Sequence, residues 1–224
     1  MPTLAIAGSN TPMPVARIIC IGRNYREHAR EMGHDPARAT PFFFFKPTSA
    51  LLPQGREFTC PWYSHQVDHE VELVIAIDRK LQNANLSQAQ DAICGFAVGL
   101  DMTCRDIQRE AKAQGRPWEL AKGFDGSAPC SALQPGRYAD LKATDTISLS
   151  VNGKITQQAS WRDMIWAVPE LIVELSRYTT LTPGDLLFTG TPAGVGPVVP
   201  GDILEAKLDD VCHLSVVVAK PAAR

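Results

Sequence analysis

Short apolar segments separated by polar turns run through most of this chain. Segments rich in β-branched and aromatic side chains predict strands, and they cover residues 17–21, 42–45, 70–77, 92–100, 146–151, 186–189, 203–208 and 212–218. Asn152-Gly153 lies between two apolar stretches and is typical of a two-residue hairpin turn. Strands therefore dominate the predicted fold.

Helical signals are fewer than strand signals. The predicted helices cover residues 24–32, 103–114 and 160–167, and a further helical apolar period runs from 169 to 178. Gly33 and Gly115 follow the first two helices and are typical of helix ends. Because helices do not regularly separate the strands, a doubly wound parallel sheet is disfavoured. The pattern predicts an α+β, mostly β, single domain.

Composition places the chain among ordinary globular proteins. It has 224 residues, of which 45% are hydrophobic and 21% are charged, enough for a sizeable core. A formal net charge of −2 argues against nucleic acid as a partner, because phosphate binding usually needs a basic face. No apolar run reaches the roughly 18 residues of a membrane span, and the N-terminus lacks the pattern of a signal peptide. We therefore expect a cytoplasmic location.

The cysteines give no sign of a disulfide framework. Six are spread through the chain without a CxxC pair, at positions 20, 60, 94, 104, 130 and 212. In a chain of this length without a signal peptide, free thiols are expected rather than disulfides. The absence of a clustered Cys/His pattern also disfavours a structural zinc site.

Three carboxylates form the most informative pattern. On a strand, Glu70 and Glu72 share one face, and Val74 and Ala76 continue that face, so it does not look simply solvated. The alternative is a half-buried strand with its polar face in water. Two carboxylates about 7 Å apart near apolar neighbours repel unless a cation lies between them. Asp101, which follows another strand, offers a third oxygen, although an aspartate there is more often a cap.

This set of oxygen ligands, without cysteine, is typical of a site for a hard cation. The pattern predicts Mg²⁺ or Mn²⁺, with Ca²⁺ less favoured.

His28 and Glu31 stand three residues apart on a predicted helix and can touch there. A carboxylate that holds an imidazole sets its tautomer and suits it to act as a general base toward water. A charged surface helix would show the same spacing, and spacing alone favours that interpretation.

Two further segments have chemical potential. Lys122 lies among small and apolar residues, where its ammonium could meet an anion or extend to solvent. Residues 189–196 are Gly-rich after a strand but lack the order of glycines found in phosphate or dinucleotide loops. Their backbone N–H groups could bind a carboxylate, or the segment could be a plain turn.

A series of short motifs occurs in a fixed order over about residues 17–218. They are Ile21-Gly22-Arg23-Asn24-Tyr25 with His28 and Glu31-Met32, Phe45-Lys46-Pro47, His69-Glu70-Val71-Glu72-Leu73, Leu100-Asp101-Met102-Thr103 with Arg105-Asp106, Leu120-Ala121-Lys122, Thr189-Gly190-Thr191-Pro192 with Gly194-Val195-Gly196, and Pro200-Gly201-Asp202. Taken together and in this order, these motifs resemble the fumarylacetoacetate hydrolase family. The resemblance is closest to the compact branch of acylpyruvate hydrolases and oxaloacetate decarboxylases, and within it to fumarylpyruvate hydrolases.

The resemblance implies a mixed β-sandwich roll, with an N-terminal extension over 1–16 and a single catalytic domain over 17–224 that pairs into a homodimer. It implies that a divalent metal is held by Glu70, Glu72 and Asp101. His28 and Glu31 would activate water on a mobile lid helix, and Lys122 would stabilise developing negative charge. The residues implied in substrate binding are Arg23, Lys46, Arg105, Gly190 and Thr191.

The implied reaction is metal-dependent hydrolysis of a carbon–carbon bond in a 2,4-diketo acid such as fumarylpyruvate, which yields pyruvate and a second acid. One alternative is oxaloacetate decarboxylation, or a related decarboxylation or isomerisation, at the same metal site. Another is a non-catalytic dimer that binds a metal and a dicarboxylate.

Overall fold

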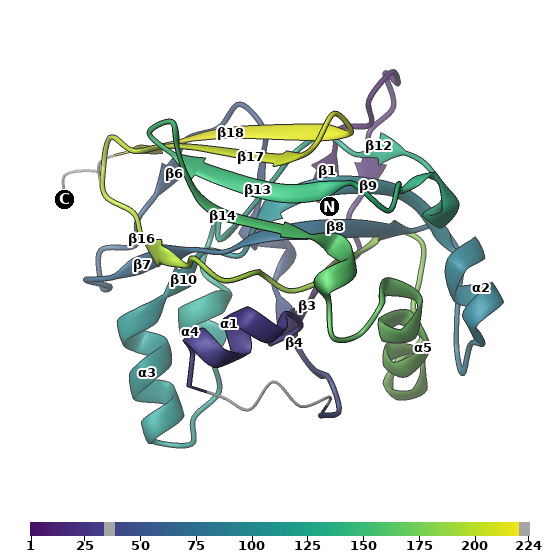
Figure 1. Ribbon diagram of the computed structural model, residues 1–224, viewed down its shortest axis with the longest axis horizontal. Coiled ribbons are helices and arrows are strands. Elements are labelled where there is room, and N and C mark those ends of the chain that lie inside the picture. Colours follow the sequence, from purple (N-terminus) through teal and green to yellow (C-terminus); the bar gives the residue numbers. More distant parts are fainter. Residues whose placement is uncertain (34–38, 220–224) are drawn as a thin grey trace.

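The computed structural model describes residues 1–33 and 39–219. Strands dominate it, as the sequence predicts, and two sheets form its body (Figure 1). The first is an eight-stranded mixed sheet in the order β4 (Phe42–Lys46), β3 (Arg17–Gly22), β15 (Asp185–Phe188), β8 (Val71–Ile77), β9 (Ile93–Leu100), β11 (Ala128–Cys130) and β5 (Leu51–Pro53), with β12 (Gln134–Pro135) paired to β9.

The second sheet has five strands and packs over β8 and β9. Its order is β14 (Lys154–Ser160), β13 (Thr146–Val151), β17 (Ile203–Leu208), β18 (Cys212–Ala219) and β6 (Phe58–Thr59). Two small sheets consist of β10 (Thr103–Cys104), β7 (Val67–His69) and β16 (Gly196–Pro197), and of β1 (Thr3–Leu4) with β2 (Met13–Pro14). The predicted hairpin is confirmed, since Asn152 and Gly153 have the positive φ angles of a tight turn between β13 and β14.

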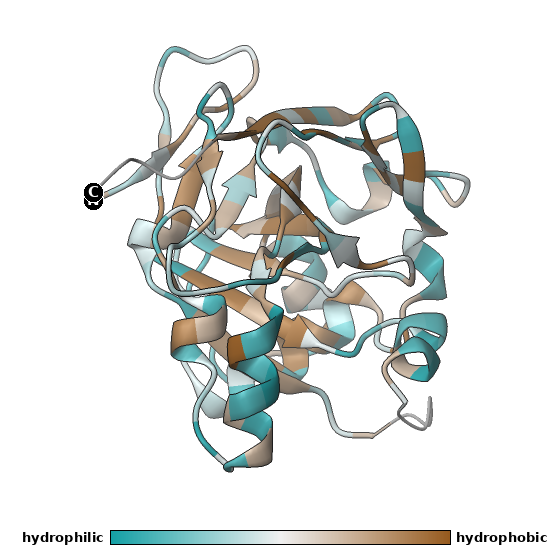
Figure 2. Ribbon diagram, turned by 90° about the vertical axis from the view of Figure 1, so that its left-hand side faces the viewer, coloured by the Kyte–Doolittle hydropathy of each residue, from teal (hydrophilic) through white to brown (hydrophobic). Residues whose placement is uncertain are grey.

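Short helices lie around the sheets. They are α1 (Arg26–Glu31), α2 (Leu86–Asp91), α3 (Arg105–Ala113), α4 (Glu119–Lys122) and α5 (Val168–Tyr178), and single 3₁₀ turns occur at Thr48–Ala50, Tyr138–Asp140 and Trp161–Asp163. Hydrophobic residues gather on the inner strands, whereas the peripheral helices carry many hydrophilic residues (Figure 2). None of the described helices is long and apolar enough to span a membrane.

Strand β8 is buried on both faces, which positions the site. Leu73 and Ile75 belong to the core cluster that reaches the five-stranded sheet, while Val74 and Ala76 belong to a second cluster with β3 and β15. The face that carries Glu72 is therefore enclosed by protein, and the alternative of a half-solvated strand is wrong.

The predicted helix over 160–167 is also wrong. Ser160 ends β14, and one 3₁₀ turn follows over Trp161–Asp163. The next residues bind Asn24 instead of one another, because Ile165 N–H donates to its carbonyl at 2.7 Å and Trp166 N–H to its Oδ1 at 2.8 Å. These tertiary hydrogen bonds replace the local ones that a helix needs.

The cysteines are free, as expected. Residues 1–16 pack onto the body through the buried Leu4. Two backbone hydrogen bonds also join them to it, from Ala7 N–H to the Leu133 carbonyl and from Leu133 N–H to the Ala5 carbonyl. Residues 220–224, which the sequence prediction included in the domain, lie outside the described residues.

Candidate active site

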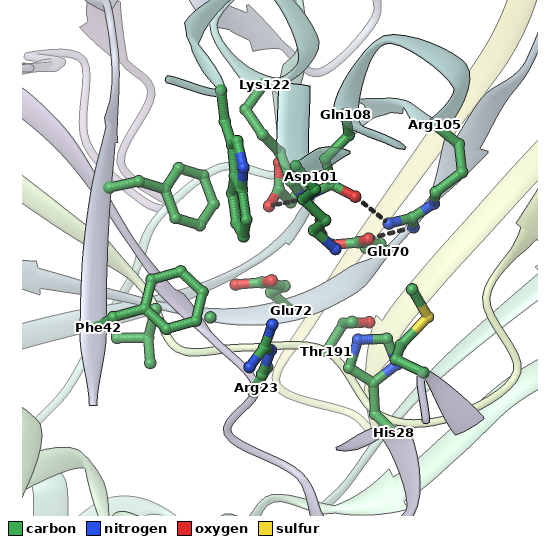
Figure 3. A pocket seen from close by; sticks show the side chains of 16 residues that line it. Arg23, His28, Phe42, Glu70, Glu72, Asp101, Arg105, Gln108, Lys122 and Thr191 are labelled. Atoms are coloured by element: carbon green, nitrogen blue, oxygen red, sulfur yellow. Dashed lines mark hydrogen bonds and ion pairs between the residues drawn. The ribbon is translucent and has the colours of Figure 1, made fainter. Parts of the chain in front are cut away.

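A pocket opens where α1, α3 and the loop after β15 meet the ends of β3, β8 and β9 (Figure 3). Most of the predicted site residues line it, namely Arg23, His28, Glu70, Glu72, Asp101, Arg105, Lys122 and Thr191. Glu31, Lys46 and Gly190 do not line it but contact residues that do. The fold thus joins residues that are far apart in sequence, as where the backbone N–H of Gly194 binds Glu31 from 163 positions away.

The three carboxylates meet because of strand register. Glu72 on β8 pairs with Gly99 on β9, and Asp101 N–H, just past β9, donates to the Glu70 carbonyl at 2.8 Å. One oxygen from each of the three carboxylates lies within 4.8 Å of the other two, and each residue is at most 5% exposed. The predicted clustering of these three acids is confirmed as geometry.

Basic groups offset this buried negative charge. Lys122 Nζ donates to Glu70 Oε2 at 2.8 Å and to Asp101 Oδ2 at 2.6 Å. Burial opposes the charge of Lys122, but the two carboxylates outweigh it and raise its pKa above the ordinary value. Burial likewise opposes ionisation of Glu70, yet Lys122 and Arg105 hold its pKa below the usual range. The pair of Glu70 and Lys122 is therefore charged.

Glu72 has less compensation. Burial, with repulsion from Asp101 and Glu70, raises its pKa well above the usual range, and Gly190 N–H, which donates to its Oε2 at 2.8 Å, only partly offsets this. Gly190 has a φ of +100°, and a Cβ there would lie 2.7 Å from Asn24 Cβ. Glycine is thus required where the backbone approaches the carboxylate.

The carboxylate cluster fits a divalent cation. Asp101 Oδ1 is buried and receives no hydrogen bond from the described residues, although Lys46 Nζ forms an ion pair with it at 2.7 Å. The stronger observation is Glu72, a buried carboxylate that its neighbours repel and that Gly190 N–H only partly compensates, because a cation would stabilise its charged form. Oxygen ligands alone suit Mg²⁺ and Mn²⁺.

Lys46 and Arg105 hold the acids in place from behind. Lys46 Nζ donates to Ser127 Oγ at 3.1 Å and to the carbonyls of Met102 and Lys122. Arg105 donates to Asp68 Oδ2 at 2.8 Å and also to Glu70. Charge-assisted hydrogen bonds of this kind are strong and directional, so the triad is rigidly placed.

His28 and Glu31 make the contact that their spacing allows. His28 Nδ1 lies 3.1 Å from Glu31 Oε2, and His28 is only 6% exposed. Glu31 also accepts from Gly194 N–H at 3.0 Å, which ties α1 to the Gly-rich loop. The alternative of a solvated surface pair is therefore wrong for His28, because the His28 side chain is buried and faces the pocket (Figure 3).

Thr191 is held by a buried side-chain relay. Gln157 Nε2 donates to Thr191 Oγ1 at 2.9 Å and to the Pro192 carbonyl at 2.8 Å. Gln157 Oε1 accepts from Val71 N–H and contacts His69 Nδ1, both at 3.0 Å. Because Thr191 Oγ1 already accepts a hydrogen bond, its own proton is free to donate into the pocket.

Sequence reasoning missed several residues of the site. Gln108 lines the pocket and accepts from Arg105 Nη1 at 2.7 Å. Its spacing of three residues from Arg105 on a predicted helix was a usable signal. Phe42, Trp118 and Lys112 also line the pocket, but only tertiary structure brings them together.

Comparisons with known proteins agree with this geometry. The sequence model of the family "fumarylacetoacetate (FAA) hydrolase C-terminal" matches residues 17–219. The crystal structure of fumarylpyruvate hydrolase from Pseudomonas aeruginosa in complex with Mn²⁺ and pyruvate is similar at a TM-score of 0.93 and 44% identity, covering 98% of this chain and 96% of that one.

Two curated relatives carry other names. Mitochondrial oxaloacetate tautomerase from Homo sapiens is 38% identical over 204 residues, which is 91% of this chain and 92% of that protein. Mitochondrial oxaloacetate decarboxylase from Dictyostelium discoideum is 43% identical over 191 residues, or 84% and 87% of the two chains. The match over nearly the whole chain and the shared fold place this protein in the fumarylacetoacetate hydrolase family.

Proposed function

We propose that this protein hydrolyses a carbon–carbon bond in acylpyruvates, with fumarylpyruvate as the best candidate. The observation that carries the proposal is the His28–Glu31 contact in the same pocket as the buried acids Glu70, Glu72 and Asp101. A base for water then stands beside a site for a cation. The likeness to fumarylpyruvate hydrolase from Pseudomonas aeruginosa supports this choice of substrate.

Glu70, Glu72 and Asp101 would hold Mg²⁺ or Mn²⁺. When bound, such a cation supplies Lewis-acid stabilisation of negative charge on the oxygens of the keto acid. The described ligands are all oxygens and do not distinguish the two metals. The Mn²⁺ in the Pseudomonas aeruginosa structure is compatible with either assignment.

His28 and Glu31 act on water. Because Nδ1 faces Glu31, that nitrogen carries the proton and Nε2 is left as the base. His28 takes a proton from water, and the water oxygen attacks the C4 carbonyl carbon. The C3–C4 bond then breaks, and its electron pair remains on the pyruvate fragment as an enolate.

Two side chains support the departing fragment. The ammonium of Lys122 lies at the carboxylates and stabilises the developing negative charge. Thr191, with its proton directed by Gln157, donates to the substrate carboxylate. The enolate takes up at C3 the proton that His28 removed from water, which gives pyruvate and restores the base. The acyl fragment leaves as the second acid, so that one water is consumed.

A second candidate function is oxaloacetate tautomerisation or decarboxylation, which is favoured by the names of the human and Dictyostelium relatives. That chemistry also forms an enolate next to a cation, but no water attacks a carbonyl. Tautomerisation still moves a proton to or from C3, so the two functions are distinguished by their products: only hydrolysis consumes water and releases pyruvate with a second acid.

The test is a substrate panel on the Mg²⁺-loaded protein, with fumarylpyruvate, acetylpyruvate and oxaloacetate as substrates. We expect loss of the diketone enol absorbance with equimolar release of pyruvate, and about 10²–10⁴-fold lower kcat in His28→Ala. His213→Ala, which changes an exposed histidine on β18, is the control and should match wild type. Turnover of oxaloacetate alone, or an active His28→Ala variant, would contradict the proposal.

A further inference from the structure

Two cations stand at the mouth of the pocket, each beside an aromatic ring. The Arg23 guanidinium carbon lies 5.6 Å from the centre of the Phe42 ring, and Lys112 Nζ lies 5.0 Å from the Trp118 ring. The two rings meet edge to face, with centroids 5.4 Å apart. Together Arg23, Phe42, Trp118 and Lys112 form one continuous wall, which we call the mouth wall.

The backbone holds Arg23 in an unusual conformation. Its φ is +59°, in the left-handed region that side chains other than glycine rarely adopt. The preceding Gly22 leaves room for Phe42, since a Cβ there would fall 1.9 Å from that ring. In Figure 3, Arg23 lies beside Phe42 and on the other side of the carboxylates from Lys122. Such strained positions cluster at functional sites.

Neither cation of the mouth wall has an anionic partner among the described residues. Arg105 and Lys122, in contrast, both form ion pairs with the buried acids. Burial, followed by repulsion from Arg105 and Arg23, lowers the pKa of Lys112. The mouth wall therefore has an excess of positive charge that an anion would relieve.

The charge of the whole pocket leads to the same point. Among the described residues that line it, four are cationic (Arg23, Arg105, Lys112 and Lys122) and three are carboxylates (Glu70, Glu72 and Asp101). The lining is thus net positive, and a divalent cation would make it more so. The carboxylate of a keto acid, bound beside the three acids and their cation, would leave the charge of Arg23 and Lys112 without a partner.

We propose that Arg23 and Lys112 form a subsite for a second carboxylate, at the far end of the substrate from its keto acid. Phe42 and Trp118 cover the apolar chain between the two ends. The favoured substrates are then dianions, and acylpyruvates that end in a methyl group are disfavoured. As a statement about the reaction this rests on the proposed function, but as a statement about binding it does not.

The binding test uses 2-oxo acids, which need no turnover. Titration calorimetry on the Mn²⁺-loaded protein compares 2-oxoglutarate, 2-oxoadipate and 2-oxopimelate, each with the 2-oxo monoacid of equal carbon number. We expect wild type to prefer at least one diacid by about fivefold or more, a modest effect because both Arg23 and Lys112 are exposed. Lys112→Met keeps the aliphatic stem and should lower that preference about fivefold.

Lys80→Met is the matched control, because it removes an exposed lysine that does not line the pocket, and it should keep the wild-type preference. The proposal is overturned if diacids and monoacids bind equally at every length, or if Lys112→Met keeps the preference. If the preference is present and lost as expected while no acylpyruvate is cleaved, the subsite stands and the hydrolase assignment fails.

Discussion

Replacing Glu72 by glutamine should stabilise the metal-free protein and abolish most of its response to metal. Glu72 lies with Glu70 and Asp101 inside a cluster of oxygens within 4.8 Å. If Glu72 stays ionised, two unit charges at about 5 Å repel by roughly 3 kcal/mol at an effective dielectric constant of about 20. Its raised pKa means that the folded state can instead take up a proton, which at neutral pH also costs free energy relative to the unfolded state, where Glu72 is ionised. Lys122 offsets part of this repulsion, so we expect a gain of about 1–3 kcal/mol for Glu72→Gln. Glutamine can still accept the hydrogen bond from Gly190 N–H.

The metal response is expected to change in the opposite direction. A metal at about 100 times its Kd adds about 2.7 kcal/mol to wild type, which for a domain of this size raises Tm by roughly 5–10 °C. If the substitution weakens binding about 100-fold, the same concentration adds only about 0.4 kcal/mol, or roughly 1 °C.

The assay is thermal unfolding followed by circular dichroism, in EDTA and in MnCl₂. Glu110→Gln, on the exposed side of α3, makes the same chemical change away from the site and should keep the full metal shift. The reasoning is refuted if Glu72→Gln is less stable than wild type in EDTA, or if it keeps the wild-type shift in Tm with Mn²⁺.

Gly190→Ala should lower the free energy of unfolding by about 2–3 kcal/mol in urea denaturation. Gly201→Ala should lower it less, because both positions have a φ near +100° but only Gly190 is crowded, by Asn24. Equal losses in the two variants would refute the crowding argument. Gln157→Leu should raise KM for fumarylpyruvate about tenfold, because Thr191 loses the hydrogen bond that orients it. In a Thr191→Val background the same substitution should raise KM far less. A tenfold rise in both backgrounds would exclude the relay from Gln157 to Thr191. Burial raises the pKa of the Cys130 thiol, so the thiol stays protonated in the folded state. In the unfolded state it ionises as pH rises above its ordinary pKa, which stabilises that state and lowers the free energy of unfolding by about 1.4 kcal/mol at about pH 9.5. In Cys130→Ala, the decrease in unfolding free energy between pH 7.5 and 9.5 should be smaller by about that amount, and an identical decrease would contradict the assignment.

The acid cluster could be predicted because it leaves a local trace. Glu72 alternates with apolar residues on a strand, and its neighbours on the same face, Val74 and Ala76, are also apolar. Such a face has to be buried, and a buried carboxylate needs a positive partner. Asp101 was linked to this group by the strand that precedes it, and the register of β8 and β9 confirms the link.

Features that depend on distant contacts left no such trace. The stretch after β14 lost its predicted helix because Asn24 binds its backbone from 142 residues away. The His28–Glu31 pair has the same spacing on a solvated helix, and only burial of His28 in the pocket distinguishes the two cases. The mouth wall joins α3 to β4, which no sequence period connects.

The most direct test of the account is proton NMR of fumarylpyruvate with the Mg²⁺-loaded protein. We predict that fumarate and pyruvate appear in equal amounts, that both cease to form after chelation of the metal, and that His28→Ala forms neither at an appreciable rate. Intact fumarylpyruvate under conditions in which the same sample accelerates enol–keto exchange or decarboxylation of oxaloacetate would contradict the hydrolase assignment.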